Sequence, residues 1–187
     1  PTIAVNTLAI SEGSTVILSA ANVNSNDPDN TAAQLTFTVS GLSGGQFELT
    51  SAPGIAVTTF TQAEINSGLV QFVHDGGEAA PIYQLTLRDG SLTSASSSVS
   101  VSFTLVNDAP TISAVSNQTV NEDSTLGPID FTISDSDSAS LTVSVSTSDG
   151  TLIPAGNIVL GGIGSNRTVT LTPAANLNGG PVTITLT

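Results

Sequence analysis

The chain has 187 residues, of which 15 are acidic and only two, Arg88 and Arg167, are basic, so its formal net charge is −13. This balance argues against nucleic-acid binding and anionic-membrane binding, because both need Lys and Arg to pair with phosphate groups. The absence of cysteine excludes disulfides and thiolate metal sites. No apolar run reaches the roughly 18–20 residues that span a bilayer. Cationic partners, above all metal ions, suit the charge.

Apolar residues alternate with Ser and Thr along most of the chain, which predicts strands with one face in a core and the other in water. The alternating runs are 35–39, 83–87, 99–105, 141–145, 169–171 and 182–186. Gly, Pro, Asn and Asp separate them at regular spacing, which is typical of β-sandwiches. One segment differs: Thr61 and Glu64 have the spacing of a capping box, and Gly68 suits a helix end, so one helical turn is expected over 61–67. The predicted fold class is all-β.

The two halves of the chain repeat a pattern without repeating letters. NTLAISEGSTVIL (6–18) parallels NQTVNEDSTLGPI (117–129), and SNDPDN (25–30) parallels SDSDSA (134–139). We therefore predict two tandem Greek-key β-sandwiches, residues 1–107 and 108–187. After the run VTITLT the second half lacks the hairpin and final strand that the first half has. Either the sequence is truncated there, or another copy of the protein supplies the strand.

Acidic residues collect where the loops of the two sandwiches are expected to meet. In a seven-strand sandwich, the loop after the fifth strand lies at the end where the chain leaves, and the loop after the second strand lies where it enters. Ca²⁺ takes six to eight oxygen ligands from such loops, and packed carboxylates without a cation repel one another. The sequence thus predicts a calcium site at the interdomain joint, with ligands from Glu12, Asp75, Glu78, Asn107, Asp108, Asp135 and Asp137. A second acidic group, Asp27, Asp29 and Asp89, is expected at the N-terminal end of the first domain, facing an upstream module.

Each acidic pair taken alone has an ordinary explanation, because Asp and Asn are frequent turn residues that bond their own backbone. His74, the sole histidine, alternates with Phe72 at the end of a strand, which favours a packed or turn-stabilising imidazole over a ligand or catalytic base. An enzyme is not expected, because the chain has no Lys, no Cys, one His and no phosphate-binding glycine loop.

Two sets of motifs resemble known repeats. The segments LTFTVSGLSGGQFELT, FTQAEINSGLVQFVHDGGE and YQLTLRDGS resemble the cadherin-like repeats of chondroitin-sulphate-proteoglycan-type ectodomains and giant bacterial surface proteins. NDAPTIS, NEDST, SDSDS and TPAANLNGGPVTIT look like the tandem Ig-like or cadherin-like repeats of very large bacterial adhesins. In calcium-dependent cadherins the ligands come from an early-strand Glu, an acidic pair before the sixth strand, an Asn-Asp linker and an Asp-x-Asp pair. This resemblance implies the same seven residues as ligands.

Three functions fit these expectations. The leading one is a non-enzymatic, extracellular pair of modules in a large surface adhesin or stalk, with neighbouring repeats as partners and calcium as the element that stiffens the joint. The second is a subunit of an extracellular filament or sheath, completed by strand donation between copies. The third is a calcium-dependent module that recognises carbohydrate or protein on a cell surface or in the matrix.

Overall fold

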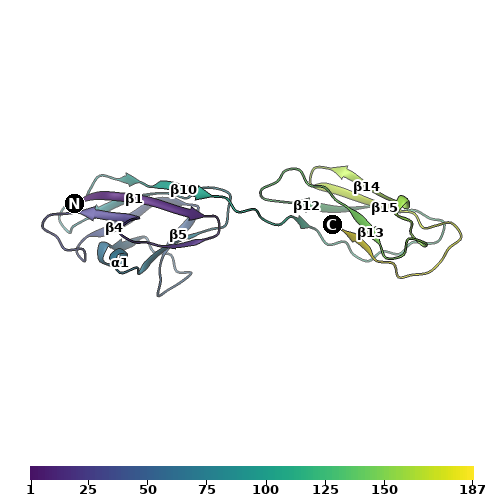
Figure 1. Cartoon of the computed structure of the whole chain (residues 1–187), viewed down its shortest axis with the longest axis horizontal. Coiled ribbons are helices and arrows are strands. Elements are labelled where there is room, and N and C mark those ends of the chain that lie inside the picture. Colours follow the sequence, from purple (N-terminus) through teal and green to yellow (C-terminus); the bar gives the residue numbers. More distant parts are fainter. The chain divides into compact units, whose positions relative to one another are not determined.

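The computed structural model describes all 187 residues, and they form two compact units, Pro1–Val106 and Asn107–Thr187. Nearly every element is a β-strand, as Figure 1 shows. The fold class predicted from the alternating runs, all-β, is confirmed. Neither the five-residue helix nor the 3₁₀ turn in the structure has the length and hydropathy needed to cross a bilayer.

The first unit is a β-sandwich whose three sheets have the strand orders β10-β1-β3, β2-β7-β5 and β6-β4-β8-β9. Its first strand changes partner along its length: it pairs antiparallel with β3 through residues 2–6 and parallel with β10 through residues 7–11. The elements are β1 (Thr2–Ser11), β2 (Thr15–Ile17), β3 (Val23–Asn26), β4 (Thr36–Ser43), β5 (Gly45–Leu49), β6 (Thr59–Thr61), α1 (Gln62–Asn66), β7 (Val70–His74), β8 (Ile82–Arg88), β9 (Ser97–Ser98) and β10 (Ser100–Thr104).

Aromatic rings fill the core of the first unit. Phe47 lies at its centre, with its ring centroid 4.8 Å from that of Tyr83, 5.1 Å from Phe72 and 5.2 Å from Phe60. Alternate residues of β4, β7 and β8 point inward, so the residues between them, such as Thr38, Gln71 and Gln84, lie on the outer face. The rings bury large apolar areas and thereby fix the distance between the sheets.

Helix α1 begins at the predicted capping box. The Thr61 hydroxyl accepts a hydrogen bond from the Glu64 amide, and the Glu64 carboxylate accepts one from the Thr61 amide. Glycine follows at position 68 with a φ of +66°, a conformation that costs glycine little. This single turn leads the chain from β6 to β7.

The second unit has a four-stranded sheet of order β11-β12-β15-β14 and a two-stranded sheet of β13 and β16. Its buried apolar core is smaller than that of the first unit and contains one aromatic ring, Phe131. The elements are β11 (Thr111–Ile112), β12 (Leu126–Ser134), β13 (Val145–Thr147), the 3₁₀ turn η1 (Ala155–Asn157), β14 (Ile158–Ile163), β15 (Asn166–Leu171) and β16 (Ile184–Leu186).

Candidate metal-binding groups

The first acidic group lies where β1 ends. Glu12 follows β1 directly, and its amide donates a hydrogen bond to the carbonyl of Thr104. Its carboxylate accepts a hydrogen bond from the backbone N–H of Val106 at 3.1 Å, and the residue is only 9% exposed. Oxygens of Glu12 and Glu78 lie within 4.8 Å of one another. The side chain of Glu12 therefore holds the last residue of the first unit through one of its carboxylate oxygens.

The loop after β7 carries Asp75 and Glu78 and lies near the end of β1. His74 holds this loop through hydrogen bonds. The Nδ1 atom of His74 accepts hydrogen bonds from the amides of Gly13 (3.2 Å) and Gly76 (3.1 Å). Its Nε2 atom therefore carries the proton and donates to the carbonyl of Ala79 at 3.2 Å. The ring is buried and stacks on Phe103, with centroids 4.8 Å apart.

These three bonds attach His74 to the immediate neighbours of all three acidic residues. Gly13 follows Glu12, Gly76 follows Asp75, and Ala79 follows Glu78. The Asp75 carboxylate itself lies outward and accepts a hydrogen bond from the Gly77 amide at 3.0 Å. The sequence predicted a turn-stabilising imidazole, and the contacts agree. Sequence reasoning did not find that this one ring connects the three segments that carry the predicted ligands, because the signal is only a histidine at an inward position of a strand.

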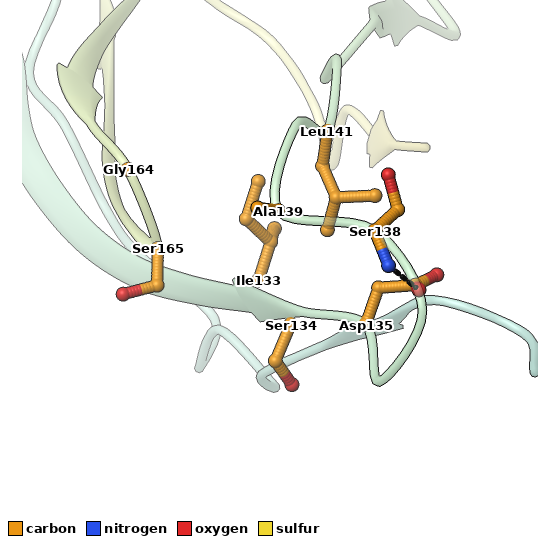
Figure 2. A pocket seen from close by; sticks show the side chains of 8 residues that line it. All are labelled: Ile133, Ser134, Asp135, Ser138, Ala139, Leu141, Gly164 and Ser165. Carbon is orange, nitrogen blue, oxygen red and sulfur yellow. Dashed lines mark hydrogen bonds between the residues drawn. The ribbon is translucent and has the colours of Figure 1, made fainter. Parts of the chain in front are cut away.

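A second acidic group lies at the N-terminal end of the second unit. The amide of Asp108 donates to Oδ2 of Asp137 at 2.5 Å. Oδ1 of Asp135 accepts hydrogen bonds from the amides of Asp137 and Ser138, at 2.9 and 2.7 Å. Figure 2 shows a pocket lined by Asp135 and Ser138 together with apolar residues such as Ile133 and Leu141, and in it the Asp135 carboxylate is turned toward the Ser138 nitrogen. These bonds hold the backbone of Asp108 against the loop that carries Asp135 and Asp137, while Asn107 bonds the carbonyl of Asp108 through its amide nitrogen at 2.7 Å.

Neither group contains a cationic side chain. Arg88 donates to the carbonyl of Gly90, and Arg167 donates to the carbonyls of Gly162 and Leu141. All donors in the two groups are oxygens, as Ca²⁺ prefers, and they lie on loops rather than inside strands. The residues present therefore fit a calcium ion by donor chemistry.

The third group contains the three aspartates predicted at the N-terminal end of the first unit. The amino group of Pro1 lies 3.0 Å from Oδ2 of Asp27 and 4.0 Å from Oδ2 of Asp89. The hydrogen bond from this ammonium lowers the pKa of Asp27 to about 2, and the neighbouring Asp27 carboxylate raises the pKa of Asp29. Backbone N–H groups of Leu92 and Ser91 lower the pKa of Asp89. In the 187-residue chain, the amino group of Pro1 thus lies among these carboxylates.

Comparison with known proteins identifies the family of the first unit. The sequence profile of the family described as Cadherin-like matches residues 1–104. Chondroitin sulfate proteoglycan 4 of Homo sapiens is 37% identical over 99 residues, which are 50% of this chain and 4% of that protein. Extracellular matrix protein 3 of Lytechinus variegatus is 34% identical over 88 residues, which are 44% of this chain and 3% of that protein. The chain thus matches only a small part of these relatives.

Among solved structures, the N-terminal eight Ig domains of Down Syndrome Cell Adhesion Molecule align with 98% of this chain and 23% of that one. The sequence identity is 14% and the TM-score is 0.33. A likeness this low supports no conclusion about function.

Proposed function

The chain belongs to the cadherin-like family, and from this premise we propose that it is a non-enzymatic pair of extracellular repeat modules whose joint is stiffened by Ca²⁺. The parent would be a large surface protein that acts as an adhesin or stalk, with neighbouring repeats as partners. The name of the Lytechinus relative, Extracellular matrix protein 3, supports the extracellular location. The seven residues of the first two acidic groups would hold the ion.

The observation that carries this proposal is that each unit has an acidic side chain that accepts a hydrogen bond from a backbone amide next to or in the linker. Glu12 accepts from the amide of Val106, and Asp137 accepts from the amide of Asp108. These two linker residues are two positions apart, so their Cα atoms are separated by at most about 7 Å of chain. Chain connectivity alone therefore limits the distance between the carboxylates of one unit and the linker residues of the other.

Repulsion between negative charges determines whether such a linker stays in one geometry or bends. Neighbouring carboxylates such as those of Glu12 and Glu78 repel each other, and water and salt screen the repulsion only in part. A divalent cation supplies the positive charge that allows them to stay together. Glu12 and Asp137 each accept a hydrogen bond from a backbone amide, and these bonds would orient their carboxylates toward the ion. His74 would hold the loop that carries Asp75 and Glu78. With the ion removed, the same charges would favour a bent and variable linker.

The test compares thermal unfolding and small-angle scattering of the 187-residue chain in calcium and in chelator. Weak extracellular sites have dissociation constants of about 10⁻⁴–10⁻³ M, so about 10 mM Ca²⁺ would stabilise the folded chain by about 1.4–2.7 kcal/mol. With calcium we expect a higher unfolding temperature. We also expect a longer mean end-to-end distance with a narrower spread around it. Asp137→Asn should reduce both effects because it keeps a carbonyl oxygen for the Asp108 amide but loses the charge.

The matched control is Asp130→Asn, which removes one exposed carboxylate from β12, outside all three acidic groups. This variant should respond to calcium like the unmodified chain. Equal unfolding temperatures and equal dimensions in calcium and chelator would overturn the proposal.

A further inference from the structure

The side chain of Arg167 lies on the inner face of β15 in the second unit. Along this strand Val169 and Leu171 are buried, 3% and 7% exposed, and Arg167 occupies the next alternate position. In the ladder with β12 it stands opposite Phe131, whose ring belongs to the apolar core. Opposite residues of an antiparallel pair share one face of the sheet, so a permanently charged guanidinium lies on the same side as the core.

The chain supplies acceptors for only part of this guanidinium. One terminal nitrogen donates to the carbonyl of Gly162 at 3.4 Å, and the other donates to the carbonyl of Leu141 at 3.1 Å. The Nε atom of Arg167 is buried and has no hydrogen-bond partner. No acidic side chain of the second unit forms an ion pair with it. Because an arginine is best satisfied by a carboxylate that accepts two parallel N–H bonds, its surroundings favour a carboxylate from outside the chain.

A pocket of about 230 Å³ lies beside the guanidinium. Its walls come from β12, β14, β15 and the segment before β13, and the apolar side chains of Phe131, Leu141, Val143 and Leu160 line it together with Arg167. No acidic residue lines it, and all lining residues lie between positions 131 and 167. The pocket therefore combines one positive group with an apolar wall, and it contains no residue of the three acidic groups.

We propose that this pocket binds a small carboxylate that carries a short apolar chain, with the carboxylate paired to Arg167. Charge complementarity selects an anion, and the apolar wall selects the chain attached to it. The wall also keeps water away from part of the site, which strengthens the attraction between guanidinium and carboxylate. Pockets for drug-sized ligands usually measure about 300–1,000 Å³, so this smaller one suits a chain of a few carbon atoms.

The test is a titration of the 187-residue chain with sodium hexanoate, followed by NMR at constant ionic strength. The amides of Leu160 and Gly162 and the Nε–H of Arg167 should shift, while the amides of β4 in the first unit should not. Hexanoate should bind at least about tenfold more tightly than acetate, which lacks the apolar chain, and than hexanamide, which lacks the charge. The titration is done in chelator, so its outcome is separate from that of the calcium proposal.

A substitution of the arginine gives the second arm. Arg167→Gln keeps a polar side chain but removes the charge and the forked donors, so hexanoate should bind at least about tenfold more weakly. Arg88→Gln is the matched control, because it removes the other arginine of the chain, which lies in the first unit and should leave the binding unchanged. If Arg167→Gln does not fold, the comparison of the three ligands on the unmodified chain decides.

Several results would overturn the proposal. These are the absence of shifts with hexanoate, equal binding of hexanoate and either acetate or hexanamide, and undiminished binding in a folded Arg167→Gln variant. A second source of the same chemistry is the C-terminal carboxylate of a polypeptide, and acetyl-glycyl-leucine represents it. If this peptide bound more than about tenfold tighter than hexanoate, the pocket would be assigned to a polypeptide end instead of a small molecule.

Discussion

Glu12 and Val106 are 94 positions apart in the chain, yet the carboxylate of the first accepts a hydrogen bond from the amide of the second at 3.1 Å. The bond attaches the end of the last strand segment of the first unit to the turn after its first strand. It also fixes the position from which the linker begins at Asn107. One side chain thus serves the stability of the unit and the geometry of the proposed calcium site.

Two substitutions of Glu12 distinguish its role in stability from its role in the proposed calcium site. Glu12→Ala leaves the Val106 amide without its acceptor and should destabilise the first unit by about 1 kcal/mol. Glu12→Gln keeps an oxygen for that amide and should lie within about 0.5 kcal/mol of the unmodified chain in chelator. Both should lose stabilisation by calcium, because both lose the charge. Urea unfolding in chelator and in calcium measures the two effects. Loss of stability with Glu12→Gln equal to that with Glu12→Ala would contradict the assignment.

His74, which holds the segments of the first acidic group, should be highly sensitive to substitution. His74→Ala removes a buried ring that stacks on Phe103 and the acceptor for two amides, so we expect a loss of about 3 kcal/mol in the free energy of unfolding. His74→Phe restores the ring without its nitrogens and should lose about 1–2 kcal/mol. Urea unfolding of the two variants measures the difference.

A readout specific to the loop supplements this comparison. The amides of Gly13 and Gly76 should exchange faster in His74→Phe, while strands far from the ring, such as β4, should keep their protection. Unchanged exchange at both glycines would show that the imidazole does not hold the loop.

The aspartates near Pro1 predict a dependence on pH. The pKa of Asp27 is lowered to about 2, mainly by the hydrogen bond from the ammonium of Pro1. A group whose pKa is depressed in the folded state stabilises the protein above its unfolded pKa, near 3.8, and this contribution is lost as the pH falls toward 2. The pKa of the Pro1 amine is raised from 8.0 by the same bond, so its contribution is present below pH 8 and is lost as the pH rises beyond it.

One added residue before Pro1 tests this pair, because it converts the amine into an uncharged amide. NMR titration should then give a higher pKa for Asp27. Asp89 is the internal control, since backbone amides of Leu92 and Ser91 are the main cause of its lowered pKa. An unchanged pKa of Asp27 in the extended chain would refute the assignment to the ammonium.

The sequence predicted the strands and much of the core, because period-two alternation follows directly from strand geometry. Phe37 and Val39 in β4 and Leu85 and Leu87 in β8 are buried where alternation placed them. The capping box of α1 was equally readable, since its two bonds are local. Such features depend on neighbours within a few positions.

Long-range pairing was harder to predict. Alternation cannot show that β1 changes partner halfway, because this change depends on a strand about 90 residues further along the chain. The acidic residues were identified by type, but their bonds to the Val106 and Asp108 amides need coordinates. Whether these residues bind calcium stays a prediction.

The two cores differ enough to predict stepwise unfolding. The first unit buries 15 apolar residues, several of them with no exposed surface, whereas the second buries six, each 3–8% exposed. Since burial of apolar surface is the main favourable contribution to folding, the second unit should unfold at a lower urea concentration than the first.

The single tyrosine makes this order measurable. Tyr83 is buried in the first unit against Phe47, and burial raises the pKa of its hydroxyl. With no tryptophan in the chain, tyrosine fluorescence reports the first unit alone, while far-ultraviolet circular dichroism reports both. We expect the circular dichroism signal to begin its transition first and the fluorescence to follow. When the urea unfolding is repeated at high pH, Tyr83 should ionise in the second step, in which the first unit unfolds, because the hydroxyl is exposed only when that core opens. Coincident transitions by both probes would mean that the units unfold together, and the difference between their cores would then not determine the order.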